Sequence, residues 1–261
     1  MKRQARVLRL QGRMIRKHVL ELEAQNLQLE NLNQEKLQLI GLVSHDLKGP
    51  FNRIFALAQL LSMENVNLTE DQKEYIGKIH QISVDGLGMV RNLLDSRRLD
   101  EKGIVLNEAE MNLSTLVSSL IKHYRPIAEK KKIEIDSEIT GAFIIKADKN
   151  YLSRVIENLI SNSVKFSEEN KKVTARLHQT NKGVEFSVKD EGPGISQSDQ
   201  QKLFQRFQTL SAKPTGGETS TGLGLFISKT ILEKMGAQII CESEEGVGAT
   251  FTVILPQQLL N

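Results

Sequence analysis

Asp190-Glu191-Gly192-Pro193-Gly194-Ile195 is the stretch from which the architecture of the C-terminal half can be worked out. It follows the apolar segment 186–188, which is typical of the end of a strand. A carboxylate in this place can accept a hydrogen bond from a nucleotide base, and glycine lets a ligand come close to the backbone. The same six residues also fit an ordinary turn, so the stretch alone leaves both interpretations open.

A second glycine-containing motif, Gly222-Leu223-Gly224, opens a helix that is predicted to run to Met235 and to end at Gly236. Glycines at a helix N-terminus leave free N–H groups and the positive end of the helix dipole for a phosphate. A simple capped helix start has the same appearance. The motif is not a P-loop, because Gly-Lys-Ser/Thr is missing.

Asn158 and Asn162 place two amides on one face of a helix predicted over residues 149–165, with Lys165 near the same end. Amide oxygens are ligands for Mg²⁺, and a lysine can contact phosphate. The alternative interpretation is a polar outer stripe on a helix that packs with its other face.

The elements around these motifs predict an α+β fold, with helices on one face of a mostly antiparallel sheet. Alternating apolar and polar residues indicate a half-buried strand over 133–139. The other expected elements are a helix over 113–130, a strand over 143–147, a hairpin of strands 173–177 and 184–188, and closing strands over 239–242 and 249–255.

The first hundred residues have a different sequence pattern. Apolar residues recur there at heptad spacing, as in Leu8, Ile15, Leu22 and Leu29. This spacing predicts a long helix that pairs with another helix as a coiled coil. Thr69 is a good N-cap for a second helix over about 70–100. Two helices with a short connection form an antiparallel hairpin, and two such hairpins bury their apolar stripes as a dimeric four-helix bundle.

Taken in chain order, the C-terminal motifs resemble the ATP-binding domain shared by histidine kinases, gyrase-type topoisomerases and related ATPases. The resemblance covers roughly residues 110–255 and implies an α/β sandwich that binds ATP with Mg²⁺. Its motifs are Asn158 to Phe166, Asp190-x-Gly192-x-Gly194, Phe204-x-x-Phe207, Gly222-x-Gly224 and Gly246-x-Gly248-x-Thr250.

The N-terminal half decides among these classes, because Ser44-His45-Asp46-Leu47-Lys48-Gly49-Pro50 lies on the first hairpin helix. With this segment the chain resembles the cytoplasmic part of a two-component sensor histidine kinase. The resemblance implies that His45 accepts a phosphoryl group, with Asp46 beside it. It also implies a coiled-coil signalling helix over 1–38, a dimerisation and phosphotransfer domain over 39–103, and a catalytic ATP-binding domain over 108–257. Pro50 is expected to kink the helix just past the histidine.

The resemblance also assigns roles in the nucleotide site. Asp190 accepts a hydrogen bond from the adenine amino group, Phe166 lies against the ring, and Asn158 ligates Mg²⁺. Residues about 196–221 form a mobile lid. The other implied contacts lie near the phosphates or the base or, for Thr250, support Asp190 through a water: Asn162, Lys165, Gly192, Gly194, Ile195, Phe207, Gly222, Leu223, Gly224 and Thr250.

Two positions depart from the family pattern. Many members carry a basic residue shortly after the paired phenylalanines, where this chain has Thr209, so Lys213 or Arg206 is expected to substitute. Gly49 stands where many members have Thr or Asn, whose side chain orients the water that hydrolyses a phosphorylated regulator. We therefore expect little phosphatase activity.

Composition adds limits. The chain has 261 residues, of which 39% are hydrophobic, and a formal net charge of +3, which does not indicate nucleic-acid binding. One cysteine excludes an intramolecular disulfide, and no uncharged stretch is long enough to span a membrane. The basic segment 1–20 fits a solvated helix face, a binding arm for nucleic acid or membrane, or a segment next to a membrane span. We expect a cytoplasmic protein, with a sensor domain or membrane segment upstream.

Three functions fit these observations. The first is an ATP-dependent histidine kinase that acts as a homodimer and passes its phosphoryl group to the receiver domain of a response regulator. The second is a conformational ATPase of the same fold, which would have no need of His45 on a hairpin. The third is a degenerate kinase that serves as a scaffold, against which the intact Asn158, Asp190 and Gly222 argue.

Overall fold

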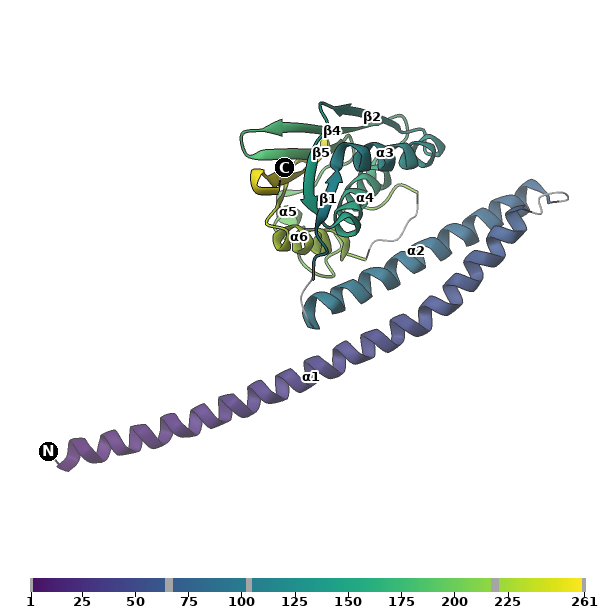
Figure 1. The fold of residues 1–261 in the computed structure, drawn as a ribbon. Coiled ribbons are helices and arrows are strands. Elements are labelled where there is room, and N and C mark those ends of the chain that lie inside the picture. Colours follow the sequence, from purple (N-terminus) through teal and green to yellow (C-terminus); the bar gives the residue numbers. More distant parts are fainter. Residues whose placement is uncertain (1, 64–67, 102–104, 217–220, 260–261) are drawn as a thin grey trace.

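The computed structural model describes residues 2–63, 68–101, 105–216 and 221–259. Helix α1 (Lys2–Met63) and helix α2 (Glu70–Glu101) form an antiparallel hairpin, and α1 extends well beyond it towards the N-terminus (Figure 1). An α/β domain lies beside α2. The long first helix and the hairpin are as predicted from the heptad spacing and the cap at Thr69, which accepts from the N–H of Gln72.

Pro50 lies inside α1 without interrupting it. Figure 1 shows a gradual curve along this helix rather than the expected sharp kink. Proline removes only one helical hydrogen bond, the one to the carbonyl of Asp46. The hairpin partner packs along the same stretch, and the helix continues for three more turns after the proline.

The hairpin holds together through a narrow strip of contacts between its two helices. The ring of Phe55 lies 4.7 Å from that of His80, centroid to centroid. Closer to His45 along α1, Phe51 packs directly on Gly86 of α2. In contrast, an apolar stripe along α1 is exposed in a single chain. Its residues include Ile15, Val19, Leu22, Leu29, Leu39 and Val43.

The contact between Phe51 and Gly86 gives a paired prediction. A Cβ added at Gly86 would overlap the Phe51 ring, whereas one at Gly77 on the same helix would meet nothing within 4 Å. Gly86→Ala should lower the stability of the hairpin by about 1–3 kcal/mol through overpacking. Gly77→Ala should raise it by up to about 1 kcal/mol through helix propensity. Thermal unfolding followed by circular dichroism measures both; equal effects of the two substitutions would contradict this packing.

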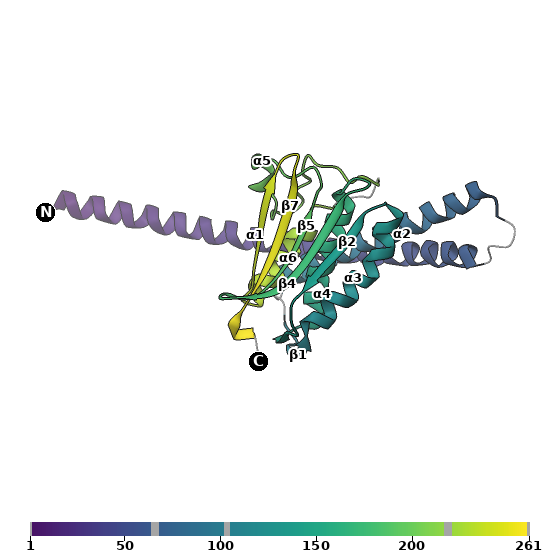
Figure 2. The same ribbon diagram turned by 90° about the horizontal axis from the view of Figure 1, so that it is seen from above.

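The α/β domain contains a five-stranded sheet with strand order β2-β4-β5-β7-β6. Strand β2 is parallel to β4, and the other neighbours are antiparallel. Helices α3, α4 and α6 cover one face of this sheet, as Figure 2 shows from above. The bounds are α3 Leu113–Lys130, β2 Glu134–Ile139, α4 Lys149–Phe166, β4 Lys172–Thr180, β5 Gly183–Asp190, α5 Gln197–Gln200, α6 Gly224–Lys234, β6 Gln238–Glu244, β7 Gly248–Pro256 and a 3-10 helix Gln257–Leu259. The α+β class is confirmed.

One predicted strand belongs elsewhere. Strand β3 (Ile144–Ala147) does not join the main sheet but pairs with β1 (Ala109–Asn112), a strand not predicted from the sequence. The two form a small separate sheet just before helices α3 and α4. Asp148, after β3, accepts hydrogen bonds from the N–H groups of Asn150 and Tyr151 and so caps the start of α4. The small sheet thus fixes where α4 begins.

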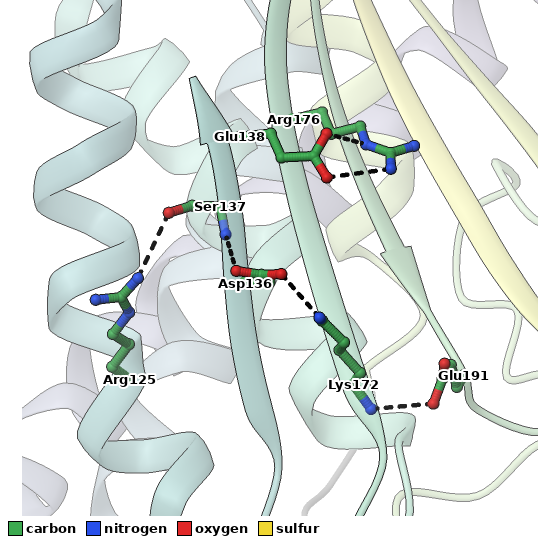
Figure 3. A network of polar contacts seen from close by, with 7 residues as sticks. All are labelled: Arg125, Asp136, Ser137, Glu138, Lys172, Arg176 and Glu191. Atoms are coloured by element: carbon green, nitrogen blue, oxygen red, sulfur yellow. Dashed lines mark hydrogen bonds and ion pairs between the residues drawn. The ribbon is translucent and has the colours of Figure 1, made fainter. Parts of the chain in front are cut away.

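Charged residues protect the edge of the main sheet at β2 (Figure 3). Arg176 on β4 donates two hydrogen bonds to Glu138, at 2.7 and 3.2 Å. Lys172 lies 2.8 Å from the carboxylate of Asp136, and this contact lowers the pKa of the aspartate. Such charges discourage edge-to-edge pairing with another sheet. We assign this face a solubilising role and place the functional site on the helical side.

Candidate functional site

A cavity of about 840 Å³ opens between the helical side of the sheet and helix α2. Its walls come from α4, the ends of β5 and β7, the lid, the start of α6, and α2 with Phe55 of α1. It collects most of the side chains predicted for a nucleotide site. Those that line it are Asn158, Asn162, Lys165, Phe166, Asp190, Gly194, Ile195, Gly222 and Gly224.

Asp190 lines this cavity at the end of β5 and is 5% exposed. Its Oδ1 accepts from the N–H of Gly192 at 3.0 Å and from that of Ala249 at 3.2 Å. Its Oδ2 accepts from the Ser163 hydroxyl at 3.3 Å. Burial raises the pKa of this carboxyl, and the three hydrogen bonds offset part of that rise. Oδ2 accepts only one of these bonds, so it keeps a lone pair for a ligand donor.

Asn158 on α4 is held in one orientation by a residue of helix α6. Its Nδ2 donates to the Ser228 hydroxyl at 3.0 Å, so its Oδ1 is the atom left to accept or to ligate. A Cβ at Gly224 would lie 2.5 Å from this Oδ1, so a glycine is required for α6 to approach so closely. An amide oxygen oriented in this way fits Mg²⁺, which commonly takes few protein ligands and completes its shell with phosphate and water. The described residues hold no cluster of three or more His, Cys, Asp or Glu side chains that would bind a metal by itself.

The start of α6 is open towards the cavity. Its N-cap, Leu223, makes no side-chain capping bond, so the first N–H groups of the helix are not covered by a cap. Gly222 and Gly224 line the cavity on either side of it. The positive end of the helix dipole therefore faces the cavity beside Asn158, which suits an anion such as a phosphate.

Four residues predicted for the nucleotide site do not present a side chain to the cavity. The Leu223 side chain is 2% exposed and belongs to the hydrophobic core. Phe207 is 56% exposed and does not line the cavity. Gly192 contributes its N–H to Asp190. Thr250 pairs with Lys189 and lies on the opposite face of β7 from Ala249, which lines the cavity.

The prediction that Thr250 supports Asp190 therefore needs correction. The support comes instead from the backbone N–H of Ala249. Alternation along a strand explains the difference, because a shift of one residue turns a side chain to the other face of the sheet.

Among the described residues of the lid, one cationic side chain lines the cavity. Lys213 lines it, together with Thr209. Arg206, the other substitute considered, has its guanidinium over the ring of Phe226, 4.3 Å from the centroid. Of the two expected substitutes, Lys213 is the one placed to meet a phosphate.

His45 lies on α1 with its side chain 88% exposed. Its Nδ1 is 3.3 Å from Oδ1 of Asp46, so the adjacent carboxylate does reach back to the ring. A proton on Nδ1, donated to this carboxylate, leaves the lone pair on Nε2. With the proton in that position, the outward Nε2 is the ring nitrogen that has the lone pair a nucleophile needs.

The comparisons with known proteins agree with this geometry. The His Kinase A (phospho-acceptor) domain family matches residues 35–102, and the histidine kinase-, DNA gyrase B-, and HSP90-like ATPase family matches residues 147–259. The chain belongs to the histidine kinase family. The first match includes His45, and the second includes the cavity residues of α4, β5 and α6.

Curated relatives are longer than this chain. The circadian input-output histidine kinase CikA of Synechococcus elongatus is 32% identical over 232 residues, which cover 87% of this chain and 31% of the relative. The sensor histidine kinase GacS of Pseudomonas protegens is 30% identical over 258 residues, or 92% of this chain and 28% of the relative. This histidine kinase chain therefore spans less than a third of either relative.

Solved histidine kinases share the fold. Full-length ShkA in complex with AMPPNP superposes with a TM-score of 0.65 and 29% identity, covering 84% of this chain and 45% of that one. The catalytic domain of the histidine kinase ThkA gives a TM-score of 0.51 and 28% identity, covering 58% of this chain and 96% of its own. Within the ranges that the structure describes, no helix is long and apolar enough to cross a membrane.

The α/β domain is docked on the helical hairpin of the same chain. Arg154 on α4 forms an ion pair with Asp95 of α2, and it also donates to Asn92 at 2.9 Å. Asp95 and Arg154 are 15% and 22% exposed, so water is largely excluded from the pair. Arg154 is one helical turn before Asn158. The same face of α4 thus holds the hairpin at one end and the cavity at the other.

Two serines that were not predicted orient the side chains of Asp190 and Asn158. Ser163 donates to Asp190, and Ser228 accepts from Asn158; both are almost fully buried. A buried serine on an apolar helix face is an available signal, because a buried hydroxyl needs a partner. Tyr124 on α3 also lines the cavity, and burial raises its pKa. Nothing in its sequence neighbourhood points to that position.

Proposed function

We propose that this chain is the kinase core of a two-component system. It binds ATP with Mg²⁺, phosphorylates His45 as a homodimer and passes the phosphoryl group to an aspartate on the receiver domain of a response regulator. The observation that carries the proposal is the pairing, in one chain, of a buried carboxylate lining a nucleotide-sized cavity and an exposed histidine with its Nδ1 at a carboxylate. We also propose the domain limits 1–38, 39–103 and 108–257 for the coiled coil, the phosphotransfer hairpin and the ATP-binding domain.

The chemistry is a phosphoryl transfer in which the protein supplies position and charge. The Nε2 lone pair of His45 attacks the γ-phosphorus, a P–N bond forms, the bond from phosphorus to the β,γ-bridging oxygen breaks, and ADP leaves. Asp46 holds the Nδ1 proton and stabilises the positive ring. Mg²⁺ held at Asn158 supplies charge neutralisation of the phosphates. Lys165, Lys213 and the start of α6 add positive potential on the same side.

The placement of His45 adds a requirement. The hairpin side of the cavity is made by α2 and Phe55, and His45 is not among the residues that line it. Transfer to this histidine therefore requires either a different placement of the ATP-binding domain or the histidine of a second copy. The exposed apolar stripe of α1 supports a second copy, since isolated helices bury such stripes by pairing.

Incubation with γ-labelled ATP tests the proposal against its two alternatives. Acid-labile label that stays on the protein and moves to a receiver domain supports the kinase. Release of free phosphate without label on the protein supports a conformational ATPase. Neither label nor hydrolysis supports a scaffold and overturns the proposed activity.

Gly49, four residues after His45, leads to a prediction about hydrolysis of the phosphorylated receiver domain. A water that attacks an aspartyl phosphate needs a side chain to orient it, and glycine offers none. We expect the wild type to have little phosphatase activity, and Gly49→Asn or Gly49→Thr to raise it by about tenfold or more. A Cβ at Gly49 would meet nothing within 4 Å, so either side chain fits.

The measurement is the rate at which a phosphorylated receiver domain loses its phosphoryl group, after subtraction of its own hydrolysis. Gly12→Asn, on the same helix and also in open space, is the matched control. Strong phosphatase activity of the wild type, removed by Asp46→Ala and unchanged in Gly49→Asn, would contradict the role given to Gly49.

A further inference from the structure

The C-terminal arm of the lid is fixed to the end of α4 through Thr215. The N–H of Thr215 donates to the carbonyl of Lys165 at 3.0 Å. Its hydroxyl lies 2.8 Å from the carbonyl of Ser167 and 3.2 Å from that of Lys165. A hydroxyl has one proton, so the shorter contact is the one it donates to. The lid thus completes hydrogen bonds that the end of α4 would otherwise lack.

Lys131, which follows α3, contacts both the end of α4 and Thr215, and the three together form one hydrogen-bonded cluster. Its Nζ donates to the carbonyls of Val164 and Lys165 at 3.1 and 3.2 Å, and to the Thr215 hydroxyl at 2.9 Å. An ammonium group is favourable at a helix C-terminus, where carbonyls and the negative end of the dipole converge. With Lys131 donating to it, the Thr215 oxygen acts as acceptor and its proton is directed to Ser167.

This cluster is connected to the nucleotide site by hydrogen bonds. Lys165 and Phe166, whose turn it holds, both line the cavity. The Ser167 hydroxyl donates to the carbonyl of Ser163 at 2.7 Å. The Ser163 hydroxyl in turn donates to Asp190. A continuous chain of contacts therefore runs from the lid to the carboxylate proposed to bind the base.

We propose that Lys131 and Thr215 are positioning residues that anchor the lid on α4 and thereby set how tightly the nucleotide is held. The inference rests on the proposed ATP site. The anchor is formed between protein groups alone, so it orders this arm of the lid before a ligand arrives. Ordering a loop in advance removes part of the cost of binding, which raises affinity without a new contact to the ligand. Loss of the anchor should weaken ATP and ADP alike and leave the rate at saturating ATP nearly unchanged.

Calorimetric titration of the full chain with ATP and with ADP tests the proposal. Thr215→Val and Lys131→Met should each weaken both nucleotides by about 3- to 10-fold, the range expected for one lost hydrogen bond. Thr215→Ser should stay within about twofold, because it keeps the hydroxyl. The double variant should bind nucleotide with the same affinity as the weaker-binding single variant, since both substitutions remove the same anchor. Lys132→Met is the matched control; that lysine pairs with Glu169 at 2.8 Å and should bind nucleotide as the wild type does.

A second readout reports the anchor directly. In the nucleotide-free chain, amide hydrogen exchange of the segment with Thr215 should speed up in Lys131→Met and not in Lys132→Met. Thr215 is exposed, so its substitution leaves the core intact, and unfolding midpoints verify this. Wild-type affinity in both Thr215→Val and Lys131→Met, or additive effects in the double variant, would overturn the anchor. If the wild type itself binds no ATP, or Asp190→Asn binds as well as the wild type, the proposed ATP site fails and the anchor with it.

Discussion

Replacing His45 by glutamine is expected to abolish incorporation of the γ-phosphoryl group while ATP affinity changes by less than about twofold. The His45 side chain is 88% exposed and does not line the cavity, so the substitution disturbs neither the core nor the nucleotide site. Glutamine has no nitrogen lone pair of comparable basicity and cannot take its place as nucleophile. Retained label after γ-labelled ATP measures the first effect, and calorimetric titration measures the second.

His18→Gln is the matched control for this variant. His18 lies on the same helix, is 74% exposed and contacts Glu21 at 3.3 Å, much as His45 contacts Asp46. We expect it to be labelled as fully as the wild type. Stable label on His45→Gln would remove His45 from the mechanism, and loss of label in His18→Gln would show that any exposed histidine of this helix affects the reaction.

Asp190→Asn is expected to weaken ATP binding by at least about 100-fold, the upper range for a lost hydrogen bond to a charged group. The protein itself fixes the amide, because the N–H groups of Gly192 and Ala249 both donate to Oδ1. An asparagine keeps its oxygen there and presents its NH₂ group in place of Oδ2. Two donors, this NH₂ and the adenine amino group, then face each other.

The same substitution should not weaken the fold. Burial holds the pKa of Asp190 above its ordinary value, so its ionised form is less favourable in the folded chain than in the unfolded one. This carboxyl therefore costs stability as the pH rises from its ordinary pKa through its raised one, and asparagine removes that cost at neutral pH. The unfolding midpoint of Asp190→Asn should be equal to or above that of the wild type. Asp136→Asn, half-buried on β2 and outside the cavity, is the acid-to-amide control for nucleotide binding.

Acidification gives an independent check on Asp190. ATP affinity should fall as the pH is lowered through the raised pKa of this carboxyl, because the protonated form loses its free acceptor. Asp190→Asn should lack this dependence. An unchanged affinity of Asp190→Asn at neutral pH would contradict the assignment of the base-binding carboxylate.

The helices of this fold could be predicted because their signals are local. The heptad spacing predicts α1 as a long helix, and α2 and α3 begin and end within a residue of the ranges predicted for them. Strand β3 was predicted, but its pairing with β1 was not. The pairing joins two strands of four residues each, and the paired residues lie 32 to 38 positions apart in the sequence, so no local pattern indicates it.

The candidate site was predictable where side chains lie on a helix or at a strand end, as for Asn158 and Asp190. It was not predictable where backbone groups do the work. Ala249 contributes an N–H, which any residue except proline has, so its identity carries no signal. The ion pair of Arg154 with Asp95 joins two domains and residues 59 positions apart in the sequence. No pattern in either segment predicts it.

Mapping the labelled position in the wild-type chain shows whether the γ-phosphoryl group of ATP is transferred to His45. The labelled full chain is digested at alkaline pH, and the phosphorylated peptide is identified by mass spectrometry. We predict a single modification on His45 that survives alkali and is lost in acid, as expected for a P–N bond. An acid-stable modification on a hydroxyl group, or an acid-labile one on another histidine such as His80, would contradict it.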